Sequence, residues 1–151
     1  MQKSTETPKT SELLQELLNT GSVTRFIKRN QEHMQKPLLH EYLKNECKKR
    51  SLLPAQVIAK SRIERAYGYH IFSGIKKPSR DKVIQLAFGF EMNYEDAQEL
   101  LKKAGKSPLY PKIMRDAVVI YALKHSLTLN EAQTALEELG IPLIDKEGRY
   151  E

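Results

Sequence analysis

The segment from Leu52 to Ala87 constrains the fold more than any other part of the chain. Its apolar residues have the spacing of two short helices, residues 53–61 and 64–72, separated by a tight turn. Pro54 falls in the first turn of one helix, where a missing N–H costs nothing, and Gly74 stops the other. A basic loop then leads to Pro78 and Ser79, which open a third helix. We expect an all-α fold.

The remainder of the chain also has helical periodicity, and the seven glycines are mostly isolated helix stops. At 151 residues the chain is long enough for one well-buried domain and an appendage. We predict three parts: an N-terminal polar arm with amphipathic helices, a helical domain, and a C-terminal helical hairpin with a short tail. Their ranges are residues 1–36, 37–104 and 105–151.

Positive charge is concentrated in the first 80 residues. Residues 37–80 hold ten Lys/Arg and three Asp/Glu, a net +7, whereas residues 1–36 carry +2 and residues 81–151 carry −3, which together give the +6 of the whole chain. Clustered cations attract polyanions through counterion release, whereas dispersed cations mainly confer solubility. The cluster coincides with the two short helices, and this coincidence favours nucleic-acid binding over a merely solvated lysine-rich face.

Other classes of protein have weaker support in the sequence. No apolar run approaches the roughly 20 residues that span a bilayer, so we expect no membrane partner. The single cysteine, Cys47, is compatible with a reducing cytoplasm and reads as a small core hydrophobe. The four histidines are scattered and lack metal-ligand spacing, and no phosphate-binding glycine loop is present. We therefore expect neither an enzyme nor a bound cofactor or metal.

The chain repeats itself with a shift of 35 residues. Residues 80–105 align without gaps on residues 115–140, with eight identities over 26 positions. The shared Arg-Asp pairs, Arg80-Asp81 and Arg115-Asp116, start the two units and suggest caps or ion pairs between helices. Amphipathic hairpins share periodicity in any case, but the identities indicate a second hairpin stacked on the first. Between them, Leu109 and Tyr110 are expected to turn inward.

Residues 38–100 resemble the Xre/phage-repressor helix-turn-helix family. The resemblance lies in Leu53 and Ala59, in the run Ile71-Phe72-Ser73-Gly74, and in Ile75-Lys76-Lys77-Pro78-Ser79. It implies a five-helix, lambda-repressor-like bundle, on which the N-terminal helices and the C-terminal hairpin pack. Residues 105–144 resemble an extension found in Xre-like regulators of Gram-positive bacteria.

The resemblance also implies a site. Helix 64–72 would read bases in the major groove of double-stranded DNA, in a cytoplasmic transcriptional regulator that acts as a homodimer. The family's base-reading positions fall on Arg65, Ala66, Tyr69 and His70, and Arg65 could bind guanine in a bidentate manner. Phosphate contacts are expected from Gln56, Lys60, Arg62, Lys76, Lys77 and Arg80.

Three features depart from the family pattern. The turn between the two helices is one residue shorter than usual. Glu64 stands where a Ser or Thr cap is usual and would face phosphate, and Gly68 replaces an apolar core residue, so that Tyr67 or Phe72 would have to fill the space. These departures keep a second hypothesis open: a protein-interaction adaptor whose N-terminal helices or C-terminal hairpin bind a partner such as a toxin or kinase.

Overall fold

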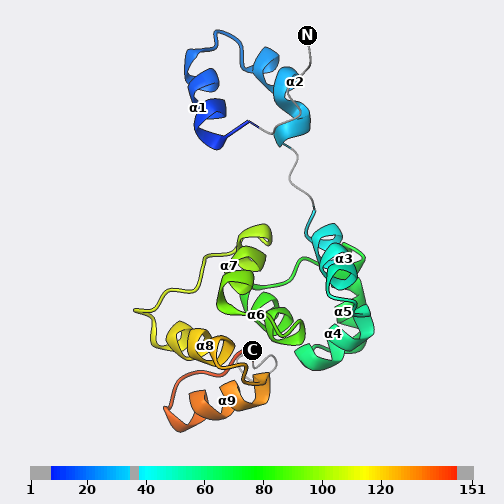
Figure 1. Ribbon diagram of the computed structural model, residues 1–151, viewed down its shortest axis with the longest axis vertical. Helices are drawn as coiled ribbons and strands as arrows, with labels where there is room; N and C mark the ends of the chain where they lie inside the picture. The colour runs from blue at the N-terminus through cyan, green and yellow to red at the C-terminus, as the bar shows by residue number, and fades with distance from the viewer. Residues whose placement is uncertain (1–7, 35–37, 146–151) are drawn as a thin grey trace. The chain divides into compact units, whose positions relative to one another are not determined.

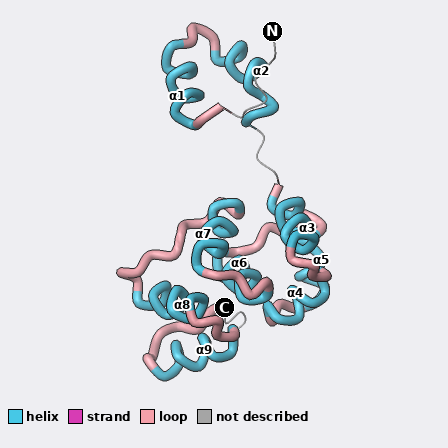
Figure 2. Tube along the Cα trace, viewed as in Figure 1, coloured by secondary structure: helices cyan, strands magenta, loops and turns pink. Residues whose placement is uncertain are grey.

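A computed structural model describes residues 8–34 and 38–145 of the chain, and within these ranges the fold consists of nine α-helices and no strand (Figures 1 and 2). The expectation of an all-α fold is confirmed. The chain divides into two compact units, residues 1–37 and residues 38–151. The predicted helix-turn-helix domain and C-terminal hairpin both lie in the second unit.

The first unit is a pair of short helices, α1 (Thr10–Asn19) and α2 (Val23–Met34). Phe26 and Asn30 are buried between them, and the Asn30 side chain donates to Glu16 Oε1 at 3.2 Å. Most of the other apolar side chains of the pair remain exposed: Leu14, Leu17, Leu18, Val23, Ile27 and Met34. The pairing of α1 with α2 therefore covers little of their apolar surface.

The second unit contains seven helices in the described residues, arranged around α6 (Figure 1). They are α3 (Leu39–Lys49), α4 (Pro54–Ser61), α5 (Arg65–Phe72), α6 (Arg80–Gly89), α7 (Tyr94–Lys103), α8 (Met114–Lys124) and α9 (Leu129–Glu138). Every residue from 82 to 90 is buried, because α6 packs on α4, α7 and α9. Apart from Lys82 and Gln85, these buried residues are apolar or glycine, as expected for a central core helix.

Two glycines allow α4 to approach its neighbours closely. A Cβ added to Gly89 of α6 would lie 1.9 Å from Ser61 Oγ and 2.5 Å from the Val57 carbonyl oxygen. A Cβ at Gly68 of α5 would lie 2.5 Å from Ile58 Cγ2. The expectation that Tyr67 or Phe72 fills the space at Gly68 is therefore wrong, because Ile58 of α4 occupies it.

The hairpins α6–α7 and α8–α9 are related by an approximate two-fold axis. Contacts between α6 and α9 have their counterpart in contacts between α7 and α8, which is the reciprocity of a two-fold interface. The Gln98 side chain exchanges two hydrogen bonds with the Leu109 backbone, at 2.7 and 3.0 Å. Its equivalent Gln133 makes the same two bonds to Ile144, both at 2.8 Å. The 35-residue repeat is thus structural.

The segment between the hairpins turns only one of its two large side chains inward. Leu109 is buried, as expected, but the Tyr110 side chain is 50% exposed. The Tyr110 backbone is nonetheless fixed, since its N–H donates to Asp116 Oδ2 at 3.0 Å. The inward orientation expected for Tyr110 is wrong.

Candidate nucleic-acid interface

A three-residue turn, Arg62-Ile63-Glu64, joins α4 to α5. Arg62 adopts the left-handed conformation, with φ 58° and ψ 25°, and its N–H donates to the Ala59 carbonyl. Ile63 is buried in the core. The left-handed backbone of Arg62 ends α4 and reverses the chain within one residue, in a conformation that disfavours residues with a Cβ. The burial of Ile63 then holds the start of α5 against the bundle.

Glu64 is the N-cap of α5. Its carboxylate accepts hydrogen bonds from the N–H groups of Ala66, at 3.1 Å, and Tyr67, at 2.9 Å. These bonds, first that from Tyr67 and then that from Ala66, hold the pKa of Glu64 below its usual value. The carboxylate makes no ion pair in the described part of the chain. The N-terminus of α5 therefore carries its own anion.

The four predicted base-contacting residues share one side of α5. Arg65, Ala66, Tyr69 and His70 are all exposed. The Arg65 guanidinium lies 5.8 Å from the centroid of the Tyr69 ring, within reach of a cation–π contact. The opposite side is buried through Gly68, Ile71 and Phe72. The short helix thus has a core face and an open face, as a groove-reading helix requires.

The loop after α5 presents two further cations. Lys76 and Lys77 are exposed and have no ion-pair partner among the described residues. The N–H groups of Ile75 and Lys76 both donate to the His70 carbonyl, at 2.9 and 3.1 Å. Because these bonds tie the loop to the end of α5, Lys76 is held next to the exposed face of the helix.

Of the other predicted phosphate contacts, Arg62 alone is both exposed and without a side-chain partner in the described residues. Lys60 is exposed but pairs with Glu91 at 2.8 Å. The Gln56 side-chain oxygen accepts a hydrogen bond from the Leu53 N–H at 2.8 Å. This oxygen therefore caps the start of α4.

Arg80 differs from the other predicted phosphate contacts. All three of its guanidinium nitrogens donate hydrogen bonds within the protein, to Asp116 and to the carbonyls of Ser107 and Pro108. The Asp116 carboxylate is almost fully buried. Arg80 therefore serves the junction of the two hairpins, and we leave it out of the interface.

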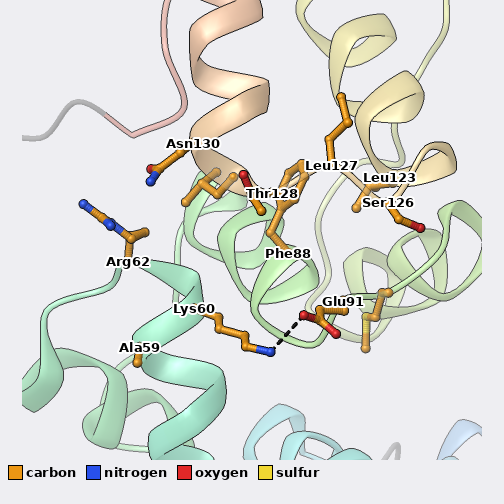
Figure 3. Close-up of a pocket in the computed structure, with 12 residues that line it drawn as sticks. Ala59, Lys60, Arg62, Phe88, Glu91, Leu123, Ser126, Leu127, Thr128 and Asn130 are labelled. Atoms are coloured by element: carbon orange, nitrogen blue, oxygen red, sulfur yellow. Dashed lines mark hydrogen bonds and ion pairs between the residues drawn. The ribbon is translucent and has the colours of Figure 1, made fainter.

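A pocket of about 600 Å³ lies where the C-terminal ends of α4, α6 and α8 meet the start of α9 (Figure 3). Phe88, Met92, Leu123 and other apolar side chains line it, and Lys60 and Glu91 form an ion pair across part of its wall. Sequence reasoning missed this pocket because its residues come from four elements and form no local motif. The remaining lining residues are Ala59, Arg62, Ser126, Leu127, Thr128, Leu129 and Asn130.

The described residues contain no cluster of three or more His, Cys, Asp or Glu side chains that could hold a metal ion. Cys47 is buried in the core, as expected, and burial raises the pKa of its thiol. Reactive cysteines have a low thiol pKa, so the raised pKa of Cys47 does not favour reactivity. A membrane-spanning helix is also missing from the described ranges, since none is long and apolar enough.

No protein family, curated protein or solved structure compared with the chain matches it.

Proposed function

We propose that the chain is a sequence-specific DNA-binding transcriptional regulator whose helix α5 enters the major groove. In this proposal α3 to α7 form the five-helix, Xre/phage-repressor-like bundle, and α4 and α5 are its helix-turn-helix. The observation that carries the proposal is the placement of unpaired cations around the exposed face of α5.

The distribution of paired and unpaired cations in residues 37–80 supports the proposal that α5 binds DNA. Within this segment Lys49, Arg50, Lys60 and Arg80 form ion pairs with carboxylates. Six cations of this segment have no such partner among the described residues. Four of the six lie in α5, in the turn before it, or in the loop after it: Arg62, Arg65, Lys76 and Lys77. Unpaired cations are the ones that can release counterions from phosphates.

The proposed roles follow from position. Arg65 would read guanine O6 and N7, and Tyr69 and His70 would contact neighbouring base edges. Arg62, Lys76 and Lys77 would bind phosphates on either side of the groove and fix the register of the helix. A homodimer would bind two half-sites roughly 34–36 Å apart.

The experiment that tests this is a fluorescence-anisotropy titration of the full chain with random duplex DNA at low and moderate salt. We expect binding that weakens steeply with salt, because each phosphate contact releases a counterion. The double variant Arg65→Ala/Lys77→Ala should lose affinity by about 10-fold or more, which is about 1.4 kcal/mol.

The matched control is Lys102→Ala/Lys112→Ala, which removes the same charge from two exposed lysines of α7 and of the segment before α8. If net charge alone attracted DNA, both double variants would lose affinity equally. Absence of binding by the unmodified chain at low salt would overturn the proposal.

A second candidate function is a protein-interaction adaptor of the toxin- or kinase-partner type, in which the helical bundle is only a scaffold. The exposed leucines of α1, Leu14, Leu17 and Leu18, support it: their i, i+3 and i+4 spacing places them on one side of the helix, and an exposed apolar patch is typical of a protein-binding surface. The ionised Glu64 at the N-terminus of α5 supports it too, since a carboxylate repels phosphate. The same titration distinguishes the two candidates.

A further inference from the structure

Helix α8 has the sequence of a helix that is buried on all sides. Residues 117–123, AVVIYAL, are an unbroken apolar run, so apolar side chains point in every direction around the helix. Its repeat equivalent α6 is also largely apolar, apart from Lys82 and Gln85, and is buried over residues 82–90. α8 therefore carries more apolar surface than one packed face requires.

One face of α8 is nevertheless open. The Met114 side chain is 73% exposed and that of Tyr121 is 60% exposed, with Val118 half-buried between them. These residues lie at i, i+4 and i+7, on one line along the helix. His125 continues the line, its ring 4.1 Å from that of Tyr121, and Ile113 flanks it with 51% exposure. We call this stripe of Ile113, Met114, Val118, Tyr121 and His125 the α8 face.

The repeat shows what covers the equivalent positions in the same molecule. Shifted by 35 residues, Tyr121 corresponds to Leu86 and Lys124 to Gly89, and both of these α6 residues are buried. Helix α4 lies directly against that side of α6, as the close approach of Ser61 to Gly89 shows. In the first hairpin this side is thus a helix-docking side. In the second hairpin no described residue covers the stripe that includes Tyr121.

Lysines border the α8 face at both ends. Lys112 and Lys124 are exposed and have no ion-pair partner among the described residues. The charged residues of the first turn are already engaged, since Arg115 binds Asp81 and Asp116 binds Arg80. The border of the face is therefore positive, and an acidic occupant complements it.

We propose that the α8 face binds an amphipathic helix of a partner protein, with Asp or Glu beside the apolar stripe of that helix. Tyr and Met are among the residues enriched in protein interfaces, and an amphipathic helix lays its apolar face into such a surface through i, i+3, i+4 and i+7 anchors. A second copy of α8 fits poorly, because packing α8 on itself in either direction brings lysine ends together. The proposal does not depend on DNA binding, because none of its residues belongs to the α5 interface.

The test is an NMR titration of the full, isotope-labelled chain with two synthetic helical peptides of about 18 residues, roughly five turns. Both peptides carry the same apolar stripe, flanked by Glu in one and by Lys in the other. We expect the Glu peptide to shift the amide signals of Met114, Val118 and Tyr121, with an affinity about 10-fold above that of the Lys peptide. The variant Lys112→Glu/Lys124→Glu should reverse this preference.

Met114→Ser/Tyr121→Ser should abolish the binding, and because both side chains are exposed the variant should fold. Leu53→Ser is the matched control, since Leu53 is also an exposed apolar residue, 65% exposed, and lies at the start of α4; it should leave the titration unchanged. Equal affinity for both peptides, or shifts that lie elsewhere on the protein, would overturn the proposal. So would broadening of the α8 signals with rising concentration of the chain alone, which would assign the face to a second copy.

Discussion

Arg115 on α8 holds Asp81 on α6 through two hydrogen bonds of 2.7 Å, one from each terminal nitrogen of the guanidinium. The repeat makes the arrangement reciprocal, because Arg80 on α6 binds Asp116 on α8 in the same bidentate way, at 3.1 and 2.9 Å. Each arginine also donates to two carbonyls of the segment that follows its own hairpin: Arg80 to Ser107 and Pro108, Arg115 to Pro142 and Leu143. The two hairpins are thus joined like the halves of a two-fold dimer within one chain.

The first prediction concerns the strength of this junction. Asp81→Asn should lower the free energy of unfolding by about 1.5–3 kcal/mol, because it weakens charge-assisted hydrogen bonds from Arg115 and from the Asp145 N–H. Urea denaturation measures this. Glu99→Gln removes an equivalent charge from a more solvent-exposed pair with Lys103, at 3.9 Å, and should cost less than about 0.5 kcal/mol. Similar losses in both variants would show that the junction contributes nothing special.

The second prediction concerns the stability of the fold at acidic pH. Burial acts to raise the pKa of Asp81, but the hydrogen bonds from Arg115 and Asp145 outweigh it and hold that pKa below its ordinary value. Folding therefore gains stability that is complete above the unfolded pKa of about 3.9 and is lost as the pH falls through the lower folded pKa. We expect the stability advantage of the parent over Asp81→Asn to shrink below about pH 4. Denaturation series at several pH values check this; an advantage that grows on acidification would contradict it.

The third prediction concerns the close approach of α4 and α5. Gly68→Ala should destabilise the fold by about 1–3 kcal/mol, because the new methyl overlaps the Ile58 side chain. Ile58→Ala removes the atoms in the way, so the double variant should be less destabilised than the sum of the two single ones. A double-mutant cycle of unfolding free energies measures the coupling, and strict additivity would show that the contact is not tight.

Much of the fold was predictable because local signals specify it. Ser79 and Asn93 cap α6 and α7 as their sequence positions indicate, accepting from the N–H groups of Lys82 and Asp96. The Arg-Asp pairs bridge helices, as expected from their place at helix starts. Such signals act within a turn of helix and therefore show in the sequence.

Long-range features were harder to predict. The reciprocal two-fold contacts, the position of Ile58 against Gly68, and the exposure of Tyr110 depend on which residues meet in space, and helical periodicity does not determine this. For the same reason the sequence assigned Arg80 to phosphate: its charge was visible, but its partner Asp116 lies 36 residues away. The open face of α8 was hidden because exposed and buried apolar residues look alike in sequence.

The fourth prediction separates stability from DNA binding at Arg62. Its left-handed conformation costs about 1–2 kcal/mol for a residue with a Cβ, whereas glycine loses about 0.5–1 kcal/mol through chain entropy. Arg62→Gly should therefore leave the stability unchanged or raise it by about 0.5 kcal/mol, while it weakens DNA binding several-fold. Thermal unfolding and anisotropy measure the two effects. Arg62→Ala, which keeps the strained conformation, should weaken DNA binding equally without the gain in stability.

The fifth prediction concerns the anion at the start of α5. Glu64→Ser keeps an N-cap oxygen for the N–H groups of Ala66 and Tyr67 but removes the negative charge. If α5 lies in the major groove, this variant should bind DNA several-fold more tightly and with a steeper salt dependence, because a repulsion next to phosphate is gone. The stability should change little, as serine caps helices well. Glu138→Gln, an exposed carboxylate at the C-terminal end of α9, is the matched control for net charge, and an equal gain in that variant would place the DNA away from α5.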